Sequence, residues 1–244
     1  MRIVTSKSGF TLVELAIVIV IIGIIAAVAT KNMSSAIDTA KYEHTKKELD
    51  QLAYAIVGNP DVYANGTRTD FGYVGDVGAL PANLDALVSN PGGLATWDGP
   101  YMGSGLNADD FKKDGWGVEY ALTGTQITST GSGSDIDKVF ASSSDELLSN
   151  AVRGVVVDAN HDVPGAIDTT SIVISLTYPD GAGSSTTAET YPGPSGNFAF
   201  TGVPIGAHQL RVVYTAQHDT ATYNISVEPN TTVKLSITFP ADLW

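Results

Sequence analysis

An apolar segment of twenty residues, from Phe10 to Ala29, constrains the fold of this chain more than any other feature. At ~1.5 Å of rise per residue, a helix of this length spans the roughly 30 Å hydrocarbon core of a membrane. Arg2 and Lys7 precede the segment and no acidic residue does, so its N-terminal side is expected to stay cytoplasmic. One carboxylate, Glu14, lies inside, where a charge costs about 2.5–3.5 kcal/mol and normally has a partner. The sequence therefore predicts a single membrane helix whose one charge has a function.

Two simpler interpretations of this segment are a secretory signal peptide and a plain membrane anchor. A secretory signal peptide would also have a basic start, an apolar middle and small residues at its end, as at Ala27-Val28-Ala29. The apolar run is long for such a peptide, and Glu14 lies within it. A plain membrane anchor is the second alternative, and it leaves Glu14 unexplained.

The string Gly9-Phe10-Thr11-Leu12-Val13-Glu14 resembles the class III leader of type IV pilins and type II secretion pseudopilins. This resemblance implies cleavage between Gly9 and Phe10 by a prepilin peptidase, followed by methylation of the new Phe10 amine. It also implies that Glu14 pairs with the Phe10 ammonium of a neighbouring subunit, so that assembly neutralises both charges. The family usually has a proline where this chain has Lys31, which is expected to lie at the membrane edge.

Composition narrows the class of function. The formal net charge is −13 and no basic stripe is present, which argues against nucleic acid as a partner. The chain contains no cysteine, so it forms no disulfides and has no thiol chemistry. Four histidines are present, but none forms a His-x-x-x-His pair or accompanies a recognisable nucleophile motif. These features favour a non-enzymatic protein with an acidic exterior.

The membrane helix is predicted to continue as a stem to about Val57. Leu49, Leu52, Ala53 and Ile56 recur at helical spacing and form one apolar face, which is expected to pack on a sheet. The string Gly58-Asn59-Pro60 then ends the helix, with glycine as the cap and proline as a block.

Residues 59 to about 137 are predicted to form short helical turns followed by a small antiparallel sheet. Leu80-Pro81 opens a turn that bears Leu84 and Leu87, the segment 114–120 leads into a strand, and Gln126–Ser129 is its hairpin partner. Major pseudopilins carry a similar Leu-Pro segment and a similar Asp-x-Trp-Gly-x-x-Tyr strand. The residues that match the second pattern are Asp114, Trp116, Gly117 and Tyr120. We interpret the two aromatic residues as part of the core.

The same resemblance raises the question of calcium. The family has an Asp-rich loop that binds this ion through carboxylate, hydroxyl and backbone oxygens. Its counterpart here, residues 129–137, is shorter and lacks one expected Asp. Ser129, Asp135 and Asp137 are the candidate calcium ligands, although a solvated Ser/Gly turn is the favoured interpretation. The string Asp158-Ala159-Asn160-His161-Asp162 imitates a calcium loop but lacks its Gly and Glu, so a turn is predicted there.

The pattern changes to closely spaced strands after a linker. Residues 142–150 form that linker, with Ser144 as the predicted N-cap of a short helix. Seven strands separated by Pro/Gly/Asn turns predict a β-sandwich. Two strings, 152–166 and 196–212, resemble transthyretin-like, carboxypeptidase-regulatory-type domains. The predicted strands are Val152–Val157, Ile172–Thr177, Thr186–Tyr191, Phe198–Thr201, His208–Tyr214, Thr222–Val227 and Thr232–Phe239.

The predicted fold class is therefore α+β, with a long N-terminal helix packed on a small antiparallel sheet and a separate all-β sandwich behind it. The predicted domains are a leader at 1–9, a helix at 10–58 with 10–30 in the membrane, a pseudopilin-like head at 59–141, the linker at 142–150 and the sandwich at 151–244.

Two functions from different classes follow. The first is a structural subunit of a type IV-class filament, either a type II secretion pseudopilus or a type IV pilus. Its partners would be copies of itself, the prepilin peptidase, an inner-membrane assembly platform and membrane lipid. It would lie in the inner membrane before assembly and in a periplasmic or cell-surface filament afterwards. The second is a filament-borne or membrane-anchored binding protein whose sandwich recognises a glycan, a surface or a secreted cargo.

Overall fold

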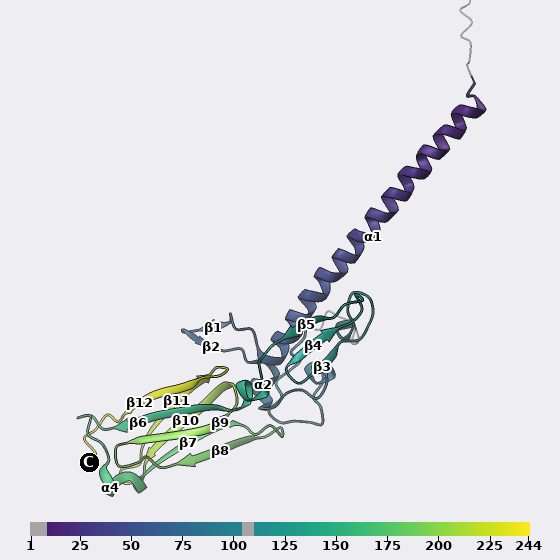
Figure 1. The fold of residues 1–244 in the computed structure, drawn as a ribbon. Coiled ribbons are helices and arrows are strands. Elements are labelled where there is room, and N and C mark those ends of the chain that lie inside the picture. Colours follow the sequence, from purple (N-terminus) through teal and green to yellow (C-terminus); the bar gives the residue numbers. More distant parts are fainter. Residues whose placement is uncertain (1–8, 104–109) are drawn as a thin grey trace, which may run out of the picture.

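The longest element is α1 (Leu12–Val57), an uninterrupted helix of 46 residues that projects far beyond the rest of the chain (Figure 1). The structure is a computed structural model that describes residues 9–103 and 110–244. Arg2 and Lys7 of the predicted leader lie outside the described residues. The predicted helix end is confirmed: Gly58 has φ 80°, and its N–H donates to the Tyr54 carbonyl at 2.7 Å. Lys31 lies within the helix, which continues unbroken through this position.

The C-terminal end of α1 is capped by a residue from outside the helix. No basic side chain lies in the last turn of α1 itself. Instead Arg68, of which only 6% is exposed, donates through Nη2 to the carbonyls of Val57 at 2.7 Å and Gly58 at 3.2 Å. Its Nε donates to the Asp70 carbonyl at 2.8 Å. A buried guanidinium thus satisfies carbonyls that have no partner within the helix.

The head is built around the C-terminal half of α1. Leu49, Leu52, Ala53 and Ile56 are all buried, which confirms the predicted apolar face. The turn carrying Leu84 and Leu87 and the predicted hairpin are also present, and a third strand, β5, extends the sheet in the order β3-β4-β5. The head elements are β1 (Tyr63–Ala64), β2 (Thr67–Arg68), α2 (Gly72–Val77), η1 (Leu84–Leu87), η2 (Asp110–Lys112), β3 (Ala121–Thr123), β4 (Gln126–Ser129) and β5 (Ile136–Val139).

The short helix of the linker is α3 (Ser144–Leu148), and its N-cap differs from the prediction by one residue. Ser143, not Ser144, accepts the N–H of Glu146 at 3.4 Å. The Glu146 carboxylate folds back onto the N–H of Ser142 at 2.7 Å. Ser143 is therefore the N-cap, while the Glu146 carboxylate binds Ser142, the residue before the cap.

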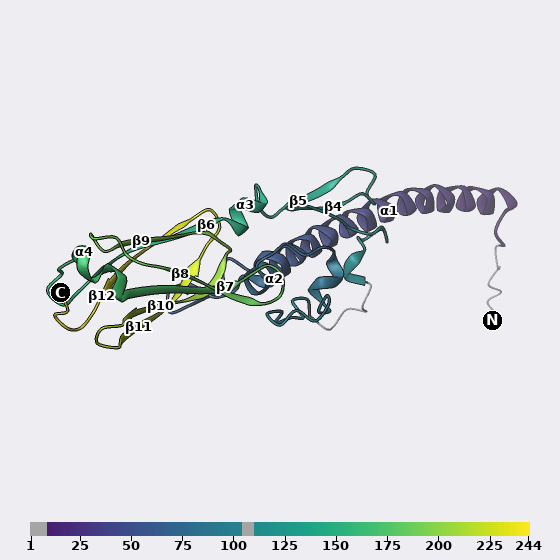
Figure 2. The same cartoon turned by 90° about the horizontal axis from the view of Figure 1, so that it is seen from below.

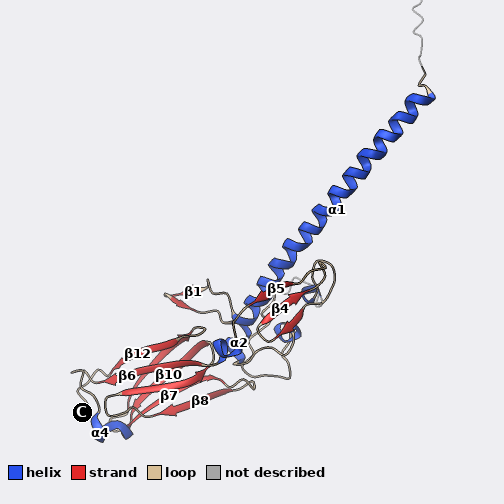
Figure 3. Ribbon diagram, viewed as in Figure 1, coloured by secondary structure: helices blue, strands red, loops and turns tan. Residues whose placement is uncertain are grey.

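All seven predicted strands of the sandwich are confirmed, with bounds that shift by a few residues. One sheet has the order β11-β10-β7-β8 and the other β12-β6-β9, in which β6 and β12 run parallel. The two sheets enclose an apolar core of their own. The bounds are β6 (Asn150–Val157), α4 (Gly165–Asp168), η3 (Thr169–Ser171), β7 (Ile172–Pro179), β8 (Ser185–Thr190), β9 (Asn197–Val203), β10 (Gly206–Tyr214), β11 (Asp219–Val227) and β12 (Thr232–Thr238) (Figure 3).

The sandwich is joined to the head by more than the linker. Ile205, in the turn between β9 and β10, is fully buried in the core of the head, and its N–H donates to the Leu147 carbonyl at 2.8 Å. The turn between β7 and β8 lies against α2, where Gly181 N–H donates to the Val77 carbonyl at 3.0 Å. We call this end of the sandwich the junction. Since three separate segments hold it, the sandwich extends the molecule in a defined direction away from α1 (Figure 2).

Candidate functional site

The first turn of α1 gives Glu14 a local partner. Thr11 is the N-cap, and its Oγ1 accepts the N–H of Glu14 at 3.2 Å. The Glu14 carboxylate accepts the Thr11 N–H through Oε2 at 3.5 Å. This capping box also places a negative charge at the positive end of the helix dipole. In the single chain, Glu14 therefore already stabilises the start of its own helix. The Thr-x-x-Glu spacing was the sequence signal for it.

The predicted processing residues lie just outside this helix. Gly9 and Phe10 precede the N-cap in non-helical backbone, and 78% of the Phe10 side chain is exposed. Both residues and Glu14 therefore lie within one short exposed segment. Cleavage after Gly9 would leave the new Phe10 amine one residue from the N-cap.

The N-terminal half of α1 contacts nothing in the described part of its own chain. Every residue from Leu12 to Ala40 is exposed. The helix contains an 18-residue window of mean hydropathy 3.0, none of it buried, and it is long and apolar enough to cross a membrane. Apolar surface of this extent marks a contact with lipid or with another protein.

In the head, Asp114 of the Asp-x-Trp-Gly motif organises the loop that follows it. Its Oδ1 accepts the N–H groups of Trp116 and Val118, each at 2.9 Å. Its Oδ2 accepts the Ser129 hydroxyl at 2.6 Å and the Gly131 N–H at 3.0 Å. The side chain is 5% exposed. Burial alone would raise the pKa of Asp114, but these hydrogen bonds outweigh it and lower the pKa.

The same motif is fastened to α1. The N–H of Gly115 donates to Thr45 Oγ1 at 3.0 Å, and the Tyr120 hydroxyl donates to Glu48 Oε2 at 2.8 Å. Thr45 is fully buried in the C-terminal half of the long helix. The motif therefore fixes the sheet to α1, which agrees with our interpretation of its aromatic residues as structural.

The three calcium candidates are not brought to one place. Ser129 ends β4, is fully buried and donates to Asp114. Asp137 lies on β5 and accepts the Thr128 hydroxyl at 2.7 Å. Thr128 and Asp137 are register partners, so Ser129 faces the opposite side of the sheet. Asp135 is exposed in the loop before β5. Residues 9–103 and 110–244 contain no cluster of three or more His, Cys, Asp or Glu suited to a metal. Calcium binding stays a prediction.

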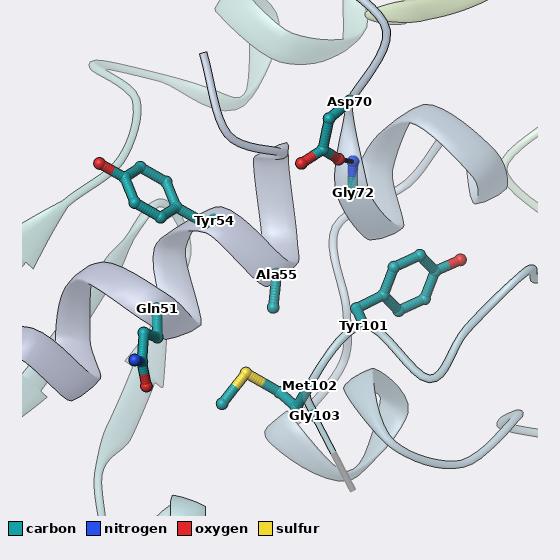
Figure 4. A pocket seen from close by; sticks show the side chains of 8 residues that line it. All are labelled: Gln51, Tyr54, Ala55, Asp70, Gly72, Tyr101, Met102 and Gly103. Carbon is teal, nitrogen blue, oxygen red and sulfur yellow. Dashed lines mark hydrogen bonds between the residues drawn. The ribbon is translucent and has the colours of Figure 1, made fainter. Parts of the chain in front are cut away.

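A hollow of about 680 Å³ lies beside the C-terminal half of α1 and was not predicted (Figure 4). Two of its polar side chains are hydrogen-bonded: Asp70 accepts the N–H groups of Asn59 and Gly72, and the Tyr101 hydroxyl donates to Asp76. Burial raises the pKa of Asp76. The hollow is lined by Gln51, Tyr54, Ala55, Asp70, Gly72, Tyr101, Met102 and Gly103.

Comparison with known proteins agrees with the geometry of the N-terminus. Residues 5–30 match the prokaryotic N-terminal methylation motif. The chain is 32% identical over 121 residues to the type II secretion system core protein G of Xanthomonas campestris pv. campestris, covering 48% of this chain and 71% of that protein. The chain belongs to the core protein G family. It is therefore a pilin-like protein of the pseudopilin branch, a class whose members are typically structural rather than enzymatic. Relative to the core protein G of Xanthomonas, much of this chain lies outside the match.

Solved structures show only slight likeness. BcpA, the major pilin subunit of Bacillus cereus, is 14% identical over 52% of this chain and 42% of its own, with a TM-score of 0.27. A streptococcal ancillary pilin is 13% identical over 37% of this chain and 32% of its own, also with a TM-score of 0.27. A dioxygenase domain from Streptomyces sp. SirexAA-E is 10% identical over 42% of this chain and 86% of its own, with a TM-score of 0.31. At these values none of them bears on function.

Proposed function

We propose that this chain is a structural subunit of a type IV-class filament, most closely of the type II secretion pseudopilus. In this proposal a prepilin peptidase cuts between Gly9 and Phe10 and methylates the Phe10 amine. The mature chain waits in the inner membrane and then polymerises through α1 into a periplasmic or surface filament. Its role is structural and not catalytic.

The observation that carries the proposal is the exposed apolar half of α1. From Leu12 to Ala29 the helix is apolar apart from Glu14 and touches no part of its own fold. Lipid can cover this surface while the subunit is stored, and the same helices of other copies can cover it in a filament. The match of residues 5–30 to the methylation motif supports the same conclusion, because that motif includes the proposed cleavage point.

The two charges at the start of the helix supply a reason for assembly. After cleavage, Phe10 would carry an ammonium group two residues before α1 begins at Leu12 and four residues before Glu14. The capping box already orients the Glu14 carboxylate toward this end of the helix. In the filament, Glu14 of one copy would pair with the Phe10 ammonium of the next, which removes the cost of two unpaired charges in an apolar environment.

Electron microscopy of sheared cell material tests the proposal. The chain is produced in bacteria together with a prepilin peptidase and a type II secretion assembly platform. We expect filaments that contain the chain, and we expect none when the peptidase is omitted. A chain that stays entirely in the membrane fraction, or that appears as a soluble monomer, with both components present would overturn the proposal.

A further inference from the structure

The end of the sandwich opposite the junction carries an exposed apolar patch. We call it the distal end; it consists of the loops 158–171, 191–196, 215–218 and 239–244, at the C-terminal label in Figures 1 and 2. Ile167 is 86% exposed, Tyr191 56% and Val163 45%. Gly165 N–H donates to the Pro194 carbonyl at 3.1 Å, which holds α4 beside the 191–196 loop. Large apolar side chains this exposed in neighbouring loops indicate a contact surface.

The distal end is also acidic. Its four loops contain no lysine or arginine. They contain Asp162 and Asp242, both exposed, and Asp168, which is partly exposed on α4 beside Ile167. Apolar residues with an acidic rim favour a partner surface that is apolar and basic, and they disfavour an anionic membrane.

This chain itself carries a surface of that chemistry on the stem of α1, residues 31–47. Four of its lysines, Lys31, Lys41, Lys46 and Lys47, lie there against two acids, Asp38 and Glu43. The stem is therefore net basic in a chain whose formal charge is −13. Its large apolar side chains are also exposed: Met33 66%, Ile37 48% and Tyr42 40%.

The shape of the molecule places these two surfaces on opposite sides of the junction between head and sandwich (Figures 1 and 2). The stem lies on the membrane side and the distal end on the other, with the sandwich held at the junction and pointing away from α1 (Figures 1 and 2). Copies that are anchored through the same helix are parallel to one another. When one copy is displaced along α1, away from the membrane, its stem comes beside the distal end of the copy that is nearer the membrane. From the stem to its end at Val57, α1 rises ~1.5 Å per residue, and the nine-residue strand β10 rises ~3.3 Å per residue. Together these lengths give a displacement on the order of 50 Å.

We propose that, within a filament, the distal end of each copy docks on the stem of another copy further along, with Ile167 against the exposed apolar residues of the stem. This inference rests on the proposed function, because it requires a filament of parallel copies. The contact is small, but the filament supplies it at high effective concentration between every such pair. The sandwich would then act as a longitudinal brace of the filament.

Cysteine cross-linking tests the contact directly, because the native chain contains no cysteine. The full chain carrying Ile167→Cys and Ile37→Cys is assembled, filaments are confirmed by electron microscopy, and a mild oxidant is applied. We expect a ladder of disulfide-linked oligomers. The matched control carries Ser236→Cys, an exposed position in the middle of β12, with Ile37→Cys, and it should give no ladder. Each single variant should give dimers at most.

A charge exchange gives a second readout in the same filaments. Asp162→Lys with Asp168→Lys should reduce the yield of the ladder at least several-fold. Adding Lys46→Glu and Lys47→Glu should restore it. Filaments that form normally but give no ladder from the 167–37 pair would overturn this inference and leave the proposed function standing. A distal end cross-linked instead to a different basic protein would overturn it too. Failure of the native chain to form filaments would count against both.

Discussion

Glu14→Gln should abolish filament assembly while leaving the amount of membrane-inserted chain unchanged. Glutamine at this position can still accept the Thr11 N–H, so the capping box survives. The amide carries no charge, and the Phe10 ammonium of the neighbouring copy is left unpaired. A loss of about 2.5–3.5 kcal/mol corresponds to a decrease on the order of 100-fold in assembly. Immunoblots of the sheared-filament and membrane fractions measure it.

The capping box supplies the matched control for this variant. Thr11→Ala removes the hydroxyl that accepts the Glu14 N–H but keeps the carboxylate. It should cost the helix about 1 kcal/mol and leave filament yield close to that of the native chain. If Glu14→Gln forms filaments normally and Thr11→Ala does not, the function of Glu14 is to cap its own helix, and the intersubunit pair is refuted.

Asp114→Ala should destabilise the head by about 3 kcal/mol or more. The substitution leaves the N–H groups of Trp116, Val118 and Gly131 and the Ser129 hydroxyl without their acceptor. The Ser129 hydroxyl is buried and the three N–H groups are partly buried, and a buried donor without a partner costs about 1–3 kcal/mol. Urea unfolding of the detergent-solubilised chain, followed by tryptophan fluorescence in the presence of a calcium chelator, measures the change.

The control for this variant comes from the loop between β4 and β5. Asp135 is exposed, and Asp135→Ala should change the free energy of unfolding by less than about 0.5 kcal/mol. Equal effects of the two substitutions would contradict the role assigned to Asp114.

The same carboxylate predicts a pH dependence. Because the pKa of Asp114 in the folded head lies below its ordinary value of 3.8, its stabilising contribution is present above pH 3.8. The contribution is lost as the pH falls through the lower, folded-state pKa. The native chain should therefore lose stability more steeply below pH 3.8 than Asp114→Asn does. Parallel slopes for the two proteins would contradict the hydrogen-bond network around this residue.

The parts of the fold that sequence could predict depend on local periodicity. The apolar face at Leu49, Leu52 and Ile56, the glycine cap at Gly58 and the seven strands of the sandwich all follow from spacing within one element. The strand β5 was missed because its short sequence, Ile-Asp-Lys-Val, follows a Ser/Gly-rich stretch that resembles a loop. Its position is set by pairing with β4, which is a tertiary interaction.

The missed features of the site depend on contacts between distant residues. Asp114 binds Ser129 and Gly131, which lie in a different strand and loop, and Arg68 caps a helix that ended eleven residues earlier. Ile205 was assigned to the sandwich by its neighbours, yet it is buried in the core of the head. Such contacts between distant residues leave no periodic pattern within a single segment of the sequence. The capping box of Thr11 and Glu14 is different, since its Thr-x-x-Glu spacing lies within one helical turn and can be recognised in the sequence.

Mass spectrometry of the mature N-terminus tests the central claim most directly. The chain is isolated from cells that contain a prepilin peptidase, digested, and its first peptide is measured. The filament account predicts a chain that begins at Phe10 and carries a methyl group on that amine. A chain that begins at Thr30 would mean ordinary secretion with loss of the apolar segment, and it would contradict the account.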